Sequence, residues 1–248
     1  MSKFISIALI FILSASLLAC ATVRKFEDAK PSPFLNIPGV DRSSKLDNLP
    51  FQHSWVAPGV DRNNYSKIFL APVTPSYVDL NDWERSRSSI ITDKNVYRKE
   101  VIALSSYTTE KMREALNNKA ENRYEVVRKA GPGTLVMEMA LTEVIFGNPV
   151  ASAGSLVAPI PGSTAMLAAV ANPSVAYEVR LRDGVSGKVV ATAADRATSA
   201  TRPINLNRLT ATSACHDIIE DSAKLLVAAL NKDEGEEISK RRFKLALW

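Results

Sequence analysis

The sequence predicts one α+β domain, in which two helices pack on a mostly antiparallel sheet after a cleaved signal peptide and an irregular tether. Strand-like and helix-like periodicities follow one another in the order β, α, β, β, β, β, α between residues 65 and 231. Residues 175–182 and 188–193 are joined by a short Asp-Gly turn that is typical of a hairpin. The 248 residues are 46% apolar and 23% charged, which excludes collagen-like, coiled-coil and wholly disordered chains.

Residues 1–19 have the features of a signal peptide. Lys3 precedes the apolar run 5–19, which is too short to cross a bilayer as a permanent helix, since that needs roughly 20 residues. The run ends in Leu17-Leu18-Ala19-Cys20, which resembles the lipobox of bacterial lipoproteins. That resemblance implies cleavage before Cys20 and a diacylglycerol on its sulfur, with Ala21 favouring the outer membrane over the inner one. The alternative is that Cys20 is a small residue at the end of an ordinary signal peptide.

Residues 20–64 are expected to form the lipidated N-terminus and an irregular tether, because they are rich in Pro, Ser, Asp and Asn and show no sustained period. One pattern occurs twice in this region. Pro38-Gly39-Val40-Asp41-Arg42 returns as Pro58-Gly59-Val60-Asp61-Arg62. The two copies are interpreted either as similar Pro-Gly turns closed by Asp side chains or as a paired docking motif.

Each element of the domain at residues 65–231 has its own signal. Residues 67–73 form an apolar run in which Pro72 suits the end of a strand. Residues 95–119 place apolar side chains at spacings of three and four, which predicts an amphipathic helix. Residues 134–146 alternate between two faces, as a strand does. The other expected elements are strands at 124–128, 175–182 and 188–193 and a helix at 207–231, followed by a charged tail at 232–248.

Residues 148–174 form an apolar insert without a charged residue. Four prolines interrupt it, so it is not a transmembrane helix. It is either a folded loop packed on its own domain or an exposed segment that contacts another copy, another envelope protein or the membrane. We favour protein contact, because backbone groups in lipid need partners. The candidate contact residues are Leu156, Val157, Ile160, Met166 and Leu167.

The most reactive residue types adjoin in Cys215-His216-Asp217. A thiolate beside a base is a nucleophile, but neighbours on a helix point about 100° apart and Cys215 falls on the apolar stripe. We interpret Cys215 as a core residue. Two Cys and two His exclude a multi-ligand zinc site, and a net charge of +5 is too small to indicate nucleic-acid binding. We therefore expect no catalytic residue, cofactor or metal.

A family resemblance spans most of the chain after the signal peptide. Phe34-Leu35, Trp55, Pro58-Gly59, Tyr65 and Lys67-Ile68, followed by Ala71-Pro72-Val73, resemble the opening of the bacterial lipoproteins with domain of unknown function (DUF) 3313. The strand at 135–146, the small-residue insert and the segment 179–183 turning through Gly187 fit the same pattern. The resemblance implies a lipoprotein of unassigned biochemical role and supplies no catalytic residues.

Two functions are therefore expected. The first is a non-enzymatic, lipid-anchored envelope protein that faces the periplasm, most simply from the outer membrane, and acts in protein interaction or structure. The second is a periplasmic hydrolase or carbohydrate-binding protein with a site near Trp83 that includes Asp82 and Glu84. A polar-lined pocket near Trp83 would favour the second function.

Overall fold

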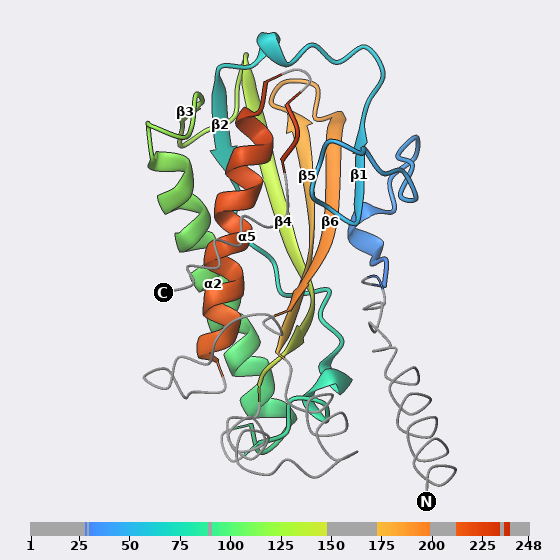
Figure 1. The fold of residues 1–248 in the computed structure, drawn as a ribbon, viewed down its shortest axis with the longest axis vertical. Helices are drawn as coiled ribbons and strands as arrows, with labels where there is room; N and C mark the ends of the chain where they lie inside the picture. The colour runs from blue at the N-terminus through green and yellow to red at the C-terminus, as the bar shows by residue number, and fades with distance from the viewer. Residues whose placement is uncertain are drawn as a thin grey trace, which may run out of the picture.

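The computed structural model describes residues 28, 30–88, 91–147, 173–198, 212–233 and 236–238. In these residues a six-stranded mixed sheet has the strand order β1-β6-β5-β4-β2-β3, and two long helices cover one of its faces (Figure 1). The strands are β1 (His53–Val56), β2 (Lys67–Leu70), β3 (Glu125–Val126), β4 (Thr134–Ile145), β5 (Ser174–Asp183) and β6 (Val189–Thr198), and the helices are α2 (Lys94–Asn117) and α5 (Ser213–Asn231). The described residues also include three short 3₁₀ helices, which are η1 (Pro33–Leu35), η2 (Arg62–Asn64) and η3 (Leu80–Trp83).

The antiparallel strands β4, β5 and β6 form the centre of the sheet. Met139 lies opposite Val179, and Val179 lies opposite Ala193, so the apolar positions of the three strands share the face toward the helices. The turn between β5 and β6 requires Gly184. A Cβ at this position would lie 2.7 Å from the Gly131 carbonyl oxygen and 2.8 Å from that of Thr134.

The two helices form because their apolar residues recur on one side. Helix α2 starts after Asp93, whose Oδ1 accepts hydrogen bonds from the backbone N–H groups of Asn95 and Val96. Its buried face includes Val101 and Leu104, as the spacing predicted. Helix α5 is confirmed from Ser213, while its expected first residues, 207–211, lie outside the described residues.

The sheet is mixed rather than uniformly antiparallel. Strand β2 pairs in parallel with both β3 and β4, whereas β1–β6, β6–β5 and β5–β4 are antiparallel. The parallel edge arises because the chain leaves β2, passes through the long helix α2 and returns to the sheet in the same direction. The expected mostly antiparallel sheet is therefore confirmed, with parallel pairing only at strand β2 among the described strands.

Within residues 20–64, which were expected to be an irregular tether, the described part contains regular elements. Strand β1 extends the sheet, with His53 opposite Ala194 and Val56 opposite Ala191. Phe34 and Leu35 of η1 are each only 4% exposed, and they cover the sheet face opposite the helices. The physical reason is that this second face carries apolar surface that needs cover, so a locally polar segment becomes ordered through contacts distant in sequence.

Polar contacts lock η1 in place. Glu178 of β5 is 3% exposed and accepts hydrogen bonds from the backbone N–H and the hydroxyl of Ser32. Arg42 donates to the Ser32 carbonyl oxygen at 2.7 Å and lies 3.9 Å from Glu178. The Arg180 guanidinium lies 4.2 Å from the centroid of the Phe34 ring. The chain is thus fixed to the sheet from residue 32 onward.

A second charged group on this face joins β4 to β5. Arg180 and Arg182 both donate to one carboxylate oxygen of Glu138. Burial by itself would raise the pKa of Glu138, but the hydrogen bonds from Arg182 and Arg180 outweigh it and hold the pKa below its ordinary value.

Several expectations fall outside the described residues. These are the signal peptide 1–19, the lipidation site Cys20, the tail beyond residue 238 and the contact residues Leu156, Val157, Ile160, Met166 and Leu167. They stay predictions. In the part of the chain that the structure describes, no helix combines the length and apolar character needed to cross a membrane.

Candidate binding pocket

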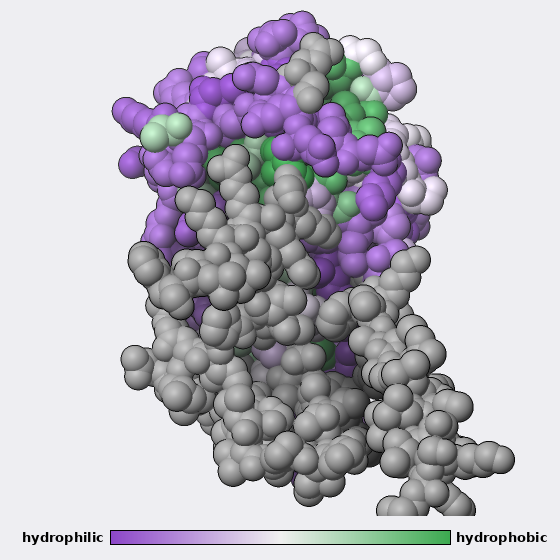
Figure 2. Space-filling view, in the orientation of Figure 1, coloured by the Kyte–Doolittle hydropathy of each residue, from purple (hydrophilic) through white to green (hydrophobic). Residues whose placement is uncertain are grey.

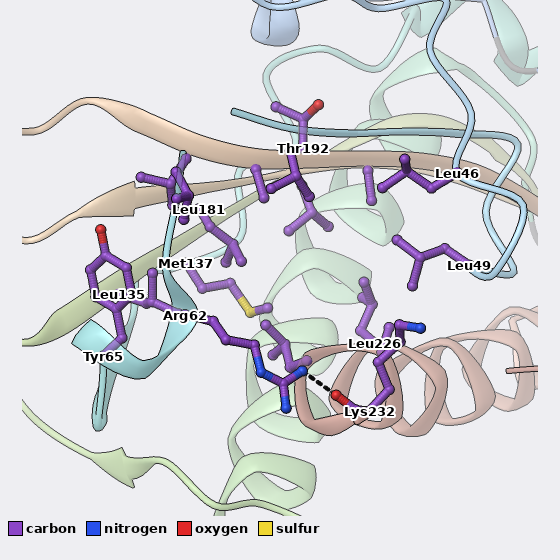
Figure 3. Close-up of a pocket in the computed structure, with 18 of the residues that line it drawn as sticks. Leu46, Leu49, Arg62, Tyr65, Leu135, Met137, Leu181, Thr192, Leu226 and Lys232 are labelled. Carbon is purple, nitrogen blue, oxygen red and sulfur yellow. Dashed lines mark hydrogen bonds between the residues drawn. The ribbon is translucent and has the colours of Figure 1, made fainter. Parts of the chain in front are cut away.

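A cavity of about 820 Å³ opens between the sheet and the C-terminal end of α5 (Figure 3). Its volume is in the range of small-molecule sites, which is about 300–1,000 Å³. Most of the lining is apolar. The sheet contributes Leu135, Met137, Val179 and Leu181, helix α5 contributes Leu226, Ala229 and Leu230, and the segment before β1 contributes Leu46, Leu49 and Phe51.

Short side chains leave this space open. Ala191 and Ala193 of β6 and Ala229 of α5 all line the cavity. Ala191 lies opposite Leu181 and Ala193 lies opposite Val179, so the two alanines share the helix-facing side of the sheet with larger neighbours. An alanine reaches only one carbon from the backbone, and the facing walls therefore do not meet at these positions.

The charged lining residues are exposed or half-buried, whereas apolar lining residues such as Met137 and Val179 are buried, so the charges lie at the mouth. Arg62 donates through Nη1 to the carbonyl oxygen of Lys232, directly after α5, and its Nη2 lies 3.4 Å from Oδ1 of Asp233. We call these two contacts the Arg62 latch. Figure 3 shows Arg62 reaching across from η2 to Lys232, with Leu46 and Leu49 on one side of it and Tyr65 and Leu135 on the other. The latch joins two rims that are 170 residues apart in sequence.

The latch belongs to the repeated Pro-Gly-Val-Asp-Arg pattern. Gly39 and Gly59 have φ values of 83° and 74°, which is the left-handed region that glycine favours in such turns. Asp41 accepts a hydrogen bond from the backbone N–H two residues later, and so does Asp61. The interpretation as two Pro-Gly turns closed by Asp is confirmed. Each copy also supplies an arginine that holds a backbone carbonyl, Arg42 at Ser32 and Arg62 at Lys232.

Asn122 holds the part of the rim that contains Arg123 and Tyr124. Its Nδ2 donates to the carbonyl oxygens of Leu116 (2.6 Å) and Tyr124 (3.0 Å), while its Oδ1 accepts from the Tyr124 backbone N–H and from Asn231 Nδ2, both at 3.2 Å. Arg123 follows it and is exposed. The Arg123 guanidinium lies 5.1 Å from the Tyr124 ring centroid, and Tyr124 lines the cavity. The end of α2, the start of β3 and the end of α5 therefore meet at one buried amide.

The molecular surface is consistent with this placement. Figure 2 shows hydrophobic residues exposed toward the upper end of this face, bordered by hydrophilic ones. Figure 1 shows that α5 ends at the upper end in the same orientation. An apolar area framed by polar residues is typical of a binding site.

The residues expected to form a polar site near Trp83 do not line this cavity. Trp83 ends η3 and is half-buried against the core, Asp82 lies 3.3 Å from Arg85, and Glu84 is exposed. Burial, together with the negative charge of nearby Glu143, raises the pKa of Asp82 above its ordinary value. Glu143 itself lies 3.3 Å from Arg85, so this group is an ion-paired cluster.

The interpretation of Cys215 as a core residue is confirmed. Its thiol is fully buried, its Sγ lies 3.5 Å from the Ile145 carbonyl oxygen, and burial raises its pKa to about 12. The His216 ring stacks on Tyr107, with centroids 4.1 Å apart. Among the residues described, no group of three or more His, Cys, Asp and Glu side chains is placed to hold a metal ion.

The comparisons with known proteins agree with the resemblance noted from the sequence. The family described as "Protein of unknown function (DUF3313)" matches residues 30–226, which is most of the chain. The chain belongs to the DUF3313 family. This match includes both copies of the repeat, η1 and most of the pocket lining. No curated protein gives a significant match to this DUF3313 chain.

Several solved structures resemble this DUF3313 chain distantly. The PelC dodecamer from Paraburkholderia phytofirmans has 15% identity and a TM-score of 0.35, covering 71% of this chain and 96% of that one. Lipoprotein GNA1162 from Neisseria meningitidis has 13% identity and a TM-score of 0.29, covering 58% and 90%. Hypothetical protein CT253 from Chlamydia trachomatis has 10% identity and a TM-score of 0.35, covering 68% and 99%.

The pocket itself was not predicted from the sequence. Its lining residues run from Leu46 to Asp233 and share no local motif. One signal was present, because the repeated pattern marks Arg62 as the counterpart of Arg42. The sequence alone did not show which carbonyl each arginine would reach.

Proposed function

We propose that this protein is a lipid-anchored, non-enzymatic binding protein of the bacterial envelope, whose pocket takes an apolar ligand. The observation that carries the proposal is the cavity itself, with apolar walls from the sheet and α5 and charged residues at its mouth. A site with apolar walls and a few polar groups binds by removing hydrocarbon from water. We favour binding over catalysis because Asp82, Trp83 and Glu84 do not line it.

The proposed anchor is Cys20, which follows Leu17-Leu18-Ala19 at the end of an apolar run. Two or more acyl chains hold a protein at a bilayer stably, at about 0.8 kcal/mol per buried methylene. Ala21 favours the outer membrane, with the domain facing the periplasm. Ser32, where the chain is fixed to the sheet, lies twelve residue steps after Cys20, and these steps span at most about 40 Å. The pocket would therefore work close to a membrane face.

The anchor is tested by metabolic labelling with radioactive palmitate. We expect the wild-type protein to take up label and to sediment with outer membranes, and the Cys20→Ala variant to do neither. Cys215→Ala is the matched control and should label like wild type. A Cys20→Ala variant that fractionates with membranes as wild type does would contradict the anchor.

The pocket is tested by the fluorescence of N-phenyl-1-naphthylamine, a neutral apolar probe. Ala229→Trp places an indole inside the cavity and should weaken probe binding at least tenfold, since Ala229 lines it. Ala228→Trp is the control, because Ala228 is the exposed neighbour on α5. Ala193→Leu fills the same space from β6 and provides a second, independent test in case Ala229→Trp fails to fold. Equal probe binding by wild type and both filled variants would refute the proposed pocket function.

A further inference from the structure

We infer that the ligand is a single acyl chain with an anionic head group, whose chain enters the cavity and whose carboxylate or phosphate binds at Arg123 and Lys232. This inference rests on the proposed function and names the ligand class of the same pocket. It is carried by two features, which are the separation of apolar floor from charged mouth and the sign of the charge that is available there.

The floor of the cavity fits hydrocarbon. Met137, Val179 and Leu135 are each less than 5% exposed and offer no strong hydrogen bond to a ligand. A polar ligand group placed among them would lose its hydrogen bonds to water without replacement, which costs on the order of 1–3 kcal/mol. Each methylene that enters contributes about 0.8 kcal/mol in favour of binding. A linear apolar chain is therefore preferred over a sugar or a peptide backbone.

The mouth favours a negative head group. Its charged lining residues are Asp61, Arg62, Arg123, Lys232 and Asp233, which sum to one net positive charge. The two carboxylates already have partners, because Asp61 accepts the Asn63 backbone N–H at 2.8 Å and Asp233 pairs with Arg62. Both carboxylates are therefore partly compensated within the protein, and the remaining net positive charge at the mouth attracts an anionic head group more than a cationic one.

Arg123 has donors to offer. Its Nη2 donates to Tyr124 Oη at 3.3 Å, and a guanidinium has five N–H groups in a fork that matches carboxylate and phosphate oxygens. The Tyr124 ring beneath it holds the guanidinium at the edge of the cavity. Lys232 adds an ammonium group whose Nζ donates to the Glu236 carbonyl and retains further N–H donors.

The C-terminal end of α5 opposes this arrangement, because its carbonyl dipoles repel anions. The structure offsets that repulsion by occupying the carbonyls. Arg62 donates to the Lys232 carbonyl, and Asn231 Nδ2 donates to the Val227 carbonyl at 2.8 Å. The Arg62 guanidinium also brings a full positive charge to the same helix end. The positive charges at the mouth therefore attract an anion more strongly than the partial negative charge of the helix end repels it.

The test measures displacement of N-phenyl-1-naphthylamine from purified full-length Cys20→Ala protein, so that no covalent lipid competes. The ligands are dodecanoate, dodecyl phosphate, dodecanol and dodecyltrimethylammonium, each below its micelle concentration. We expect dodecanoate or dodecyl phosphate to bind at least tenfold more tightly than the cationic amphiphile. The ratio of the two anions distinguishes a carboxylate head from a phosphate head.

Arg123→Gln should weaken binding of the preferred anion about tenfold and leave dodecanol unchanged, since the alcohol carries no charge to pair. Arg128→Gln is the control, because Arg128 lies just after β3, is exposed and does not line the cavity. Equal affinity for anionic, neutral and cationic chains would overturn the inference. Displacement of the probe by these chains would still support the proposed function. Failure of the neutral probe to bind at all would refute both.

Discussion

The buried amide of Asn122 is expected to contribute about 3 kcal/mol to folding. Asn122 is 8% exposed and takes part in four hydrogen bonds. The Asn122→Ala variant leaves the Leu116 carbonyl and both backbone groups of Tyr124 without that partner inside the protein. Asn231 is half-exposed and can bond water instead, so three bonds are counted. At about 1 kcal/mol for each neutral hydrogen bond, the expected loss is about 3 kcal/mol.

Urea unfolding followed by far-ultraviolet circular dichroism measures this loss. The midpoint should fall while the dependence on urea stays unchanged, since the surface exposed on unfolding is the same. Asn117→Ala is the matched control, because Asn117 is exposed at the end of α2 and should change stability by less than about 0.5 kcal/mol. The reasoning is refuted if Asn122→Ala costs less than about 1 kcal/mol, or if Asn117→Ala costs as much.

Three further predictions follow from the same structure. Because Arg180 and Arg182 hold the pKa of Glu138 down, its contribution to stability is present above its unfolded pKa and is lost as pH falls through its folded pKa. Glu138→Gln should therefore lower the urea unfolding midpoint at pH 7. It should also reduce the fall of that midpoint between pH 5 and pH 3, and an unchanged fall would contradict the ion pairs. Gly184→Ala should cost about 1–3 kcal/mol in urea unfolding because two backbone carbonyls occupy the space of its Cβ, and a neutral substitution would show that this turn relaxes. Cys215 should react with Ellman's reagent only on unfolding, as its thiol is buried with a pKa raised to about 12, so rapid reaction of the folded protein would contradict its placement.

The sequence predicted those elements whose signal is local. Strand β5 alternates apolar and polar residues over its length, and α2 repeats its apolar residues at helical spacing, so both were placed within a few residues of their observed bounds. The direction of β2 was not predicted, because side-chain alternation is the same in parallel and antiparallel strands. Strand β1 was missed because its four residues lie in a polar, proline-containing region and depend on pairing with β6.

The candidate site depends on contacts that no local pattern encodes. The cavity exists because Ala191, Ala193 and Ala229 face it together, and these residues come from a strand and a helix that only the fold brings into register. Arg62 was marked by the repeat, but its contact with Lys232 depends on where α5 ends. The Trp83 hypothesis, in contrast, relied on residue types alone, and the structure gives Asp82 an ion-pair partner in Arg85.

Native mass spectrometry of the protein gently released from bacterial membranes tests the central claim most directly. The account predicts a chain that begins at Cys20 with a covalent diacylglycerol and carries one additional, non-covalent acyl amphiphile, which Ala229→Trp loses and Ala228→Trp retains. A chain with an unmodified Cys20, or with the same bound mass in the Ala229→Trp variant as in wild type, would contradict it.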